Sequence, residues 1–145
     1  MRIISISLAI VAVLFSLVMS TNNCVNRLRV TGAGSSIVNG LYHLRQAEII
    51  PSSFSKVCFK ARWNPSDMWD QLNRGRPWWE LDNGSYIYFN GGDGQWWMDS
   101  GETGLGLYIS RSRSAEDDDG NMPPLNGWEV LGDGKLPLPK LNKET

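Results

Sequence analysis

Residues 78–98 read WWELDNGSYIYFNGGDGQWWM, and this stretch decides the fold. Three runs rich in aromatic and β-branched residues are separated by two groups of turn residues, which is the pattern of consecutive strands. Asn83 and Gly84 predict a tight two-residue hairpin turn, because both central positions of the favoured turn require positive φ. Residues 90–94, NGGDG, predict a looser loop before the third run. The stretch therefore predicts a three-strand antiparallel meander.

The same alternation of turn residues and strand-like runs extends over residues 25–131. It predicts an all-β fold, a small antiparallel sandwich or barrel of about eight short strands. The expected strands are 25–31, 40–45, 56–62, 77–82, 85–90, 95–99, 104–111 and 127–131. Helical capping signals are confined to residues 66–72, where one or two turns are expected. The final segment, 132–145, contains two prolines and is expected to be an extended or poorly ordered tail.

Each Trp-Trp pair in the meander must straddle the sheet, because neighbouring strand residues point to opposite faces. If Trp79 and Trp96 point inward, an aromatic row lies on the outer face: Trp78, Tyr86, Tyr88, Trp97 and Tyr108. Aromatic rings suit the C–H faces of sugars, and nearby polar side chains can bind the hydroxyls. The expected polar partners are Glu80 and Asp99, with Asn90, Asp93 and Gln95. The row therefore indicates a ligand-binding surface; the alternative is that both faces are buried and the row is a second core.

The N-terminal residues predict the compartment. Met1 and Arg2 form a short positive region, residues 3–19 are apolar apart from three serines, and residues 18–20 fit a signal-peptidase site. Residues 1–20 are therefore predicted to be a cleaved signal peptide, followed by a single β domain at 21–131. A membrane anchor is the alternative, because the apolar run approaches the length that spans a bilayer. Cleavage would leave 125 of the 145 residues as a secreted, extracellular protein with no membrane partner.

Charge argues against a nucleic-acid partner. Without Arg2, the 14 basic side chains become 13 against 15 acidic ones, a formal charge of −2. The one acidic run, Glu116 to Asp119, could hold calcium or mineral through oxygen ligands, but it lacks the spacing of a calcium-binding loop. A solvated acidic loop is the simpler interpretation.

Two features are typical of extracellular proteins. Cys24 and Cys58 are the only cysteines, and in an oxidising compartment they are expected to form a disulfide. Two separate buried thiols are the alternative. Asn83, Gly84 and Ser85 form a glycosylation sequon, so Asn83 is a candidate glycan attachment site.

Catalytic and cofactor motifs are incomplete in this sequence. Residues 30–34, VTGAG, begin like a dinucleotide-binding turn, but Ile37 stands where the third glycine belongs. His43 is the only histidine, and no serine lies in a nucleophile elbow. Glu80 with Asp99 could flank a glycosidic bond, which keeps a glycoside-acting enzyme as an alternative. The sequence otherwise predicts a non-enzymatic protein without cofactor or metal.

A set of motifs distributed along the chain carries a resemblance to a known kind of domain. They are VTGAG at 30–34, VNGLY at 38–42, the later aromatic positions, PPLNGW at 123–128 and GKLPLP at 134–139. With these the chain resembles a recurrent small β domain found singly or in tandem in proteins of protists and marine invertebrates. The resemblance covers nearly all of 21–145 and implies the fold, but it carries no functional residue.

The sequence as a whole favours a secreted binding protein that recognises glycan or extracellular matrix through its aromatic face. A structural component of an extracellular or biomineral organic matrix, using residues 116–119, is the alternative from another class. An enzyme acting on glycosides is the third.

Overall fold

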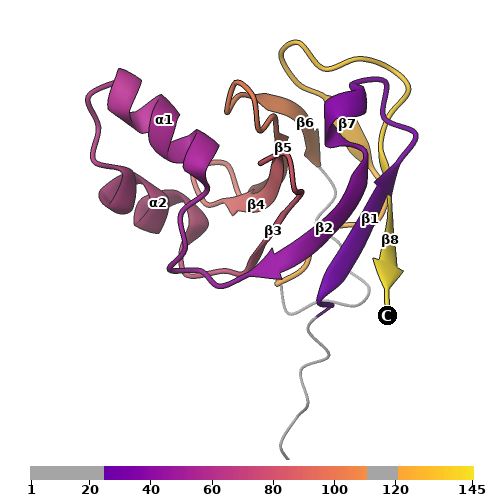
Figure 1. Cartoon of the computed structure of the whole chain (residues 1–145), viewed down its shortest axis with the longest axis horizontal. Helices are drawn as coiled ribbons and strands as arrows, with labels where there is room; N and C mark the ends of the chain where they lie inside the picture. The colour runs from indigo at the N-terminus through magenta and orange to yellow at the C-terminus, as the bar shows by residue number, and fades with distance from the viewer. Residues whose placement is uncertain (1–24, 111–120) are drawn as a thin grey trace, which may run out of the picture.

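The main feature of the molecule is one antiparallel sheet of eight strands, curled into a half-barrel (Figure 1). The computed structural model of the chain describes residues 25–110 and 121–145. The strands are β1 Arg27–Thr31, β2 Gly40–Arg45, β3 Trp78–Glu80, β4 Tyr86–Asn90, β5 Gln95–Asp99, β6 Gly106–Ser110, β7 Trp128–Val130 and β8 Lys140–Glu144. The predicted all-β class and the meander of β3, β4 and β5 are confirmed.

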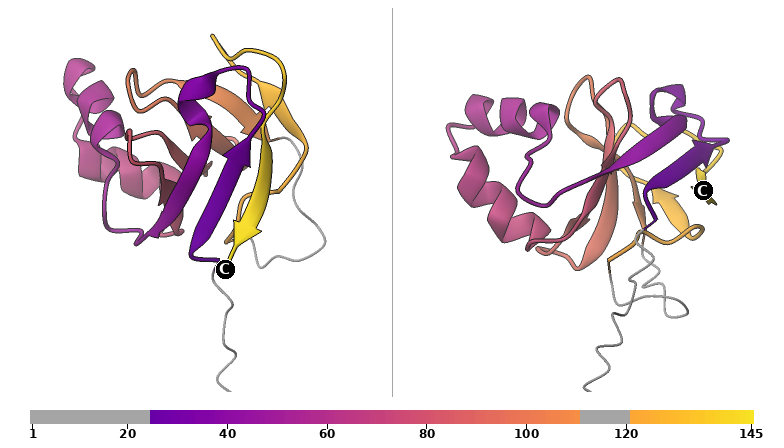
Figure 2. Two further views of the ribbon diagram at one scale, coloured as in Figure 1. Left: turned by 45° about the vertical axis from the view of Figure 1, so that its right-hand side comes forward. Right: turned by 60° about the horizontal axis from the view of Figure 1, so that its bottom comes forward.

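The C-terminal segment, which was expected to be an extended or poorly ordered tail beyond the β domain, contributes the strand β8 to the sheet. The strand order is β7-β6-β5-β4-β3-β2-β1-β8, and β8 returns to pair with β1 over five residue pairs, from Arg27 with Glu144 to Thr31 with Lys140. The left view of Figure 2 shows β1 and β8 side by side. An ion pair between Arg29 and Glu144 adds to the pairing. Prolines 137 and 139 precede the strand, where a missing N–H costs no ladder hydrogen bond.

The hairpin between β3 and β4 differs from the prediction in its length. Leu81 N–H donates to Ser85 O at 2.8 Å, and Gly84 N–H donates to Leu81 O at 2.8 Å, so three residues rather than two lie between the paired residues Leu81 and Ser85. Gly84 alone of these has positive φ, at 85°. Asn83 instead uses its side-chain oxygen to accept from Ser85 N–H at 2.9 Å, which is the local turn bond that asparagine favours.

Two helices lie against one face of the sheet. The helix α2, Pro65–Asn73, confirms the predicted turns at 66–72, with the Asn64 side chain capping Ser66 and Asp67 N–H groups. The helix α1, Ser52–Lys60, replaces the strand predicted at 56–62. Phe54 and Cys58 in α1 continue a four-residue spacing that begins at Ile50, just before the helix, and this helical spacing turns one side of α1 toward the sheet. A 3-10 turn, η1 Ser36–Val38, links β1 to β2.

The sheet separates two hydrophobic cores, called here the inner core and the outer core. The inner core fills the concave side with residues from all eight strands, among them Leu28, Tyr42, Trp79, Ile87, Trp96, Met98, Tyr108, Trp128 and Leu141. The outer core lies under α1 and α2 and consists of Phe54, Cys58, Trp69, Trp78, Tyr86 and Tyr88. The two helices therefore cover the face on which a binding surface was expected (Figure 1).

The predicted signal peptide at 1–20 lies outside the described residues and stays a prediction. Within residues 25–110 and 121–145, no helix combines the length and apolarity needed to cross a bilayer.

Candidate functional site

Apart from Tyr108, the expected aromatic row packs into a second core, which is the alternative to an exposed binding surface. Trp78 and Tyr86 are 0% exposed and Tyr88 is nearly so, while Trp97 is half-buried. Strand parity itself holds for both Trp-Trp pairs: Trp78 and Trp97 lie on the outer side, and Trp79 and Trp96 on the inner side. What the prediction missed is the cover over the outer side.

That cover is an interlocked set of aromatic rings. Trp69 of α2 meets Trp78 edge-on with ring centroids 5.7 Å apart, and Phe54 of α1 meets Trp69 at 5.1 Å. Both indole N–H groups are satisfied by the loop before α1, Trp78 donating to Gln46 O at 3.0 Å and Trp69 to Ala47 O at 2.8 Å. Edge-to-face packing and satisfied N–H groups are what buried tryptophans require. The row is therefore the floor of a second core.

Tyr108 leaves the row altogether, because it points into the inner core. The register between β5 and β6 shifts between Met98 and Asp99: Met98 pairs with Tyr108, but Asp99 pairs with Gly106. The extra residue, Leu107, forms a bulge and reverses the side that Tyr108 faces. Sequence parity placed Tyr108 outward and could not foresee the inserted residue.

Asp99 is a buried carboxyl group beside the outer core. Burial raises its pKa from 3.8 to about 7, and the interaction with the Tyr86 hydroxyl offsets part of this increase. Burial, followed by the negative charge of Asp99, raises the pKa of Tyr86, Tyr88 and Tyr42 well above the usual value for tyrosine. The tyrosines are therefore neutral around this carboxyl, which is enclosed rather than open to a substrate.

Three of the other predicted polar partners are engaged within the protein, whereas the side-chain oxygen of Gln95 is buried without a hydrogen-bond partner. Glu80 pairs with Arg45 at 2.7 Å. Asp93 accepts from Trp97 Nε1 at 2.7 Å and from Gln95 N–H at 2.9 Å. Asn90 is buried, and its side-chain oxygen accepts from Gly92 N–H at 2.9 Å. These contacts hold the strands and the loop between β4 and β5, so the predicted site residues are not gathered around an open space.

The extracellular features remain predictions. Cys58 lies in the outer core, where burial raises the pKa of its thiol. Cys24 lies outside the described residues, as does the acidic run at 116–119. Asn83 is exposed, but its side-chain N–H donates to Ile37 O at 2.7 Å, and Ser85 of the same sequon is buried. In the folded chain the glycan attachment atom of Asn83 is thus already hydrogen-bonded.

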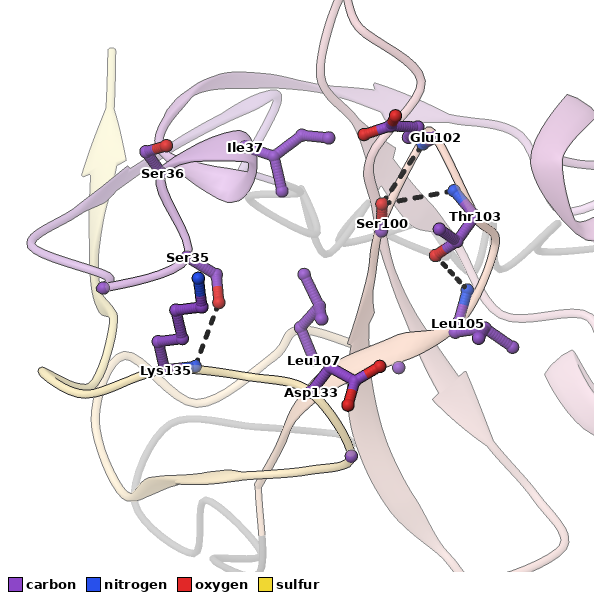
Figure 3. A pocket seen from close by; sticks show the side chains of 13 residues that line it. Ser35, Ser36, Ile37, Ser100, Glu102, Thr103, Leu105, Leu107, Asp133 and Lys135 are labelled. Atoms are coloured by element: carbon purple, nitrogen blue, oxygen red, sulfur yellow. Dashed lines mark hydrogen bonds between the residues drawn. The ribbon is translucent and has the colours of Figure 1, made fainter.

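A cleft of about 380 Å³ opens at one end of the half-barrel. Three loops far apart in the sequence line it: residues 34–37 between β1 and β2, residues 100–107 between and within β5 and β6, and residues 132–135 between β7 and β8. Figure 3 shows Ser100, Glu102 and Thr103 on one side, Asp133 and Lys135 on the other, and Ile37 and Leu107 between them. This cleft, called here the loop cleft, is the candidate functional site.

Backbone N–H groups hold the hydroxyls of the loop cleft in place. Ser35 Oγ accepts from Lys135 N–H at 3.0 Å, Ser100 Oγ from Glu102 N–H at 3.2 Å and from Thr103 N–H at 3.3 Å, and Thr103 Oγ1 from Leu105 N–H at 3.2 Å. Each oxygen is thereby an acceptor, and its own O–H can still donate to a ligand. The carboxylates of Glu102 and Asp133 make no ion pair with another described residue.

The motifs at 30–34, 38–42 and 134–139 anchor the same end of the molecule. Gly34 N–H donates to Pro137 O at 2.8 Å, and any side chain at Gly34 would collide with the Leu136 carbonyl. Tyr108 hydroxyl accepts from Ser35 N–H at 2.9 Å and donates to Lys135 O at 2.5 Å. The Asn39 side chain bonds both the N–H and the C=O of Ala33. The polar groups of these motifs are therefore used to fix two of the three loops that line the cleft.

The loop cleft offers hydrogen bonding rather than an evident reaction centre. Among the described residues, no three His, Cys, Asp or Glu side chains gather where they could hold a metal ion. His43 is exposed on β2 and does not line the cleft. Comparisons of the chain with protein-family models, with curated proteins and with solved structures return no match.

Proposed function

We propose that the chain is a secreted, non-enzymatic protein that binds a carbohydrate of the extracellular matrix in the loop cleft. The observation that carries this proposal is the composition of the cleft: oriented hydroxyls, two carboxylates without ion pairs, and apolar side chains within one hollow. Secretion follows from the signal peptide expected at 1–20.

The chemistry of the cleft matches that of a sugar. Sugar hydroxyls both donate and accept, so they need partners of both kinds, and an unpaired buried hydroxyl is costly. Glu102 and Asp133 supply acceptors, while Ser100, Thr103 and Lys135 supply donors. Ile37 and Leu107 provide an apolar surface for the C–H groups of the ring (Figure 3).

Rigidity favours affinity for such a ligand. The rims at 34–37 and 132–135 are tied to each other through Ser35, Lys135 and Tyr108. Groups that are already in place lose little conformational entropy when they bind, so more of the interaction free energy appears as affinity. The buried aromatic row plays no direct part; it supports the sheet from which the loops leave.

A glycan array with wild-type protein and with a Glu102→Gln, Asp133→Asn double variant tests the proposal. Replacing both carboxylates removes two charge-assisted acceptors, and we expect affinity for the bound glycan to fall at least ~10-fold. Glu48→Gln, an exposed change outside the cleft, is the matched control and should leave binding unchanged. The proposal fails if wild type binds no glycan, or if the double variant binds as well as the control.

A further inference from the structure

The corner between α1 and α2 projects from the molecule and exposes two large aromatic rings. Residues 59–64 are exposed without interruption. Phe59 is 68% exposed and Trp63 is 53% exposed, although every other tryptophan in the described residues is buried or half-buried. This corner, residues 56–63, is called here the tip.

The backbone holds the tip in a fixed conformation. Trp63 N–H donates to Cys58 O at 2.9 Å and Arg62 N–H donates to Phe59 O at 3.1 Å, which is a Schellman helix ending. Arg62 occupies the left-handed position of that ending, with φ 59°, where glycine is favoured. On the other side, the Asn64 cap fixes the start of α2. The two rings are thus presented by an ordered turn.

The tip is also the site of a local positive charge. Lys56, Lys60 and Arg62 are exposed, and residues 49–66 contain no aspartate or glutamate. None of the three forms an ion pair with a described residue. On α1, Phe59 follows Lys56 by three residues and Lys60 follows Lys56 by four. The two cations and the ring therefore lie on one helix face. Because the whole chain has a slight negative charge, this concentration is local.

We infer that the tip is a second binding surface, whose ligand is a sulfated or carboxylated polysaccharide. Lysine and arginine would bind the anionic groups, and the two rings would lie against the C–H faces of the sugars between them. An acidic bilayer is the competing partner for a surface of cations and aromatic rings. However, amphipathic helices insert an apolar face, and the apolar face of α1, with Phe54 and Cys58, is already buried on the sheet. An anionic polymer therefore fits the tip better.

This inference shares with the proposed function the carbohydrate class of the ligand, but it concerns a separate surface, since no tip residue lines the loop cleft. The probe is heparin, with uncharged dextran of similar length as the comparison. We expect the full mature chain to bind heparin and not dextran. Because binding releases counterions, the affinity for heparin should fall roughly 10-fold or more between about 50 mM and about 200 mM salt.

Two sets of variants test the contribution of the tip. Lys56→Gln with Lys60→Gln and Arg62→Gln should reduce heparin affinity at least ~10-fold, and Phe59→Ala with Trp63→Ala should reduce it by a smaller factor. All five positions are exposed, so thermal unfolding of both variants should remain close to that of wild type. Lys140→Gln with Lys143→Gln, exposed on β8, is the matched control and should leave binding unchanged.

The outcomes separate this inference from the proposed function. It is overturned if heparin does not bind, if the β8 control loses as much affinity as the tip variant, or if phosphatidylserine vesicles or a single-stranded oligonucleotide bind more tightly than heparin. The Glu102→Gln, Asp133→Asn variant should retain heparin binding. If the tip variants lose heparin binding but no glycan binding is lost in the cleft variant, the proposed function fails and the inference about the tip stands. If the cleft variant loses glycan binding but the tip variants keep heparin binding, only the inference about the tip fails.

Discussion

The central strands of the sheet are buried on both faces, but the two faces are closed in different ways. The inner core is closed by the sheet itself, because curling brings residues of all eight strands together. The outer core is closed by two helices inserted between β2 and β3, and it uses only the central strands and the helices. One long sheet thus has a core made of its own strands on one side and a core that depends on a separate pair of elements on the other.

This difference matters for function because it determines which surfaces are free. On the inner side, the sheet leaves an open end, where loops from three parts of the chain form the loop cleft. On the outer side, the helices bury the aromatic row and expose a new surface of their own, the tip. An aromatic ring in a strand is therefore a poor guide to a binding surface unless the covering elements are known.

Adjacent tryptophans allow the two cores to be compared directly. Trp78→Ala and Trp79→Ala each remove a fully buried indole, and both should lower the free energy of unfolding by about 3–5 kcal/mol. The two variants should differ in which part of the chain unfolds locally. Without Trp78, amide hydrogens of α1 and α2 should exchange faster than those of the sheet, whereas the loss of Trp79 should raise exchange throughout. Hydrogen exchange followed by mass spectrometry measures this, and identical patterns would show that the two cores unfold as one.

The sequence was sufficient to predict one side of this comparison. Alternation placed Trp79 and Trp96 on the inner side because a strand has a strict two-residue period. It failed at α1, where Val57, Cys58 and Phe59 look like a strand, although Ile50, Phe54 and Cys58 carry a helical period. Composition favours a strand at this position and spacing favours a helix, so composition alone does not reveal the cover of the outer core.

The candidate site could not be predicted for a different reason. The loop cleft brings together Ser35, Ser100 and Lys135 only because β8 returns to β1 and the sheet curls. Neither the return of β8 nor the curl leaves a local signal in the sequence. Tyr108 shows the same limit at a smaller scale, since a single bulge between β5 and β6 reversed its direction. Alternation is a local rule, whereas a cleft built from loops is set by topology.

The pH dependence of stability gives another test of the outer core, because Asp99 is a carboxyl group buried with it. Because its pKa rises from 3.8 to about 7 on folding, the folded chain holds this proton more tightly than the unfolded chain. Its contribution to stability is therefore complete below pH ~4 and is lost as pH rises through about 7, a change on the order of 4 kcal/mol.

Asp99→Asn should remove that pH dependence while keeping the size of the side chain. Urea unfolding of both proteins between pH ~4 and ~8 is the measurement. We expect the stability of wild type to fall relative to that of the variant as pH rises. A constant difference between the two curves would mean that Asp99 is not buried in the manner described.

The edge strand β8 tests how far the inner core depends on the end of the chain. Leu141 is buried against the inner core and pairs with Val30 of β1. Leu141→Ala should cost about 2–3 kcal/mol in chemical unfolding. The neighbouring change Asn142→Ala, at an exposed position, should cost less than about 0.5 kcal/mol. If both substitutions had equally small effects on the free energy of unfolding, the C-terminal segment would be a poorly ordered tail.

The smallest expected effect separates stability from binding at the tip. Arg62 has φ 59°, so Arg62→Gly should relieve backbone strain and raise the free energy of unfolding by about 0.5–1 kcal/mol. Thermal or urea unfolding gives this value, and a loss of stability would contradict it.

The same variant removes one of the three cations that the tip offers to a polyanion, so heparin affinity should fall. A gain in stability together with a loss of affinity is the pattern expected when strain is retained for function. If stability rises and affinity is unchanged, the strained residue contributes nothing to docking, and the role of the tip would have to be carried by Lys56, Lys60 and the two rings.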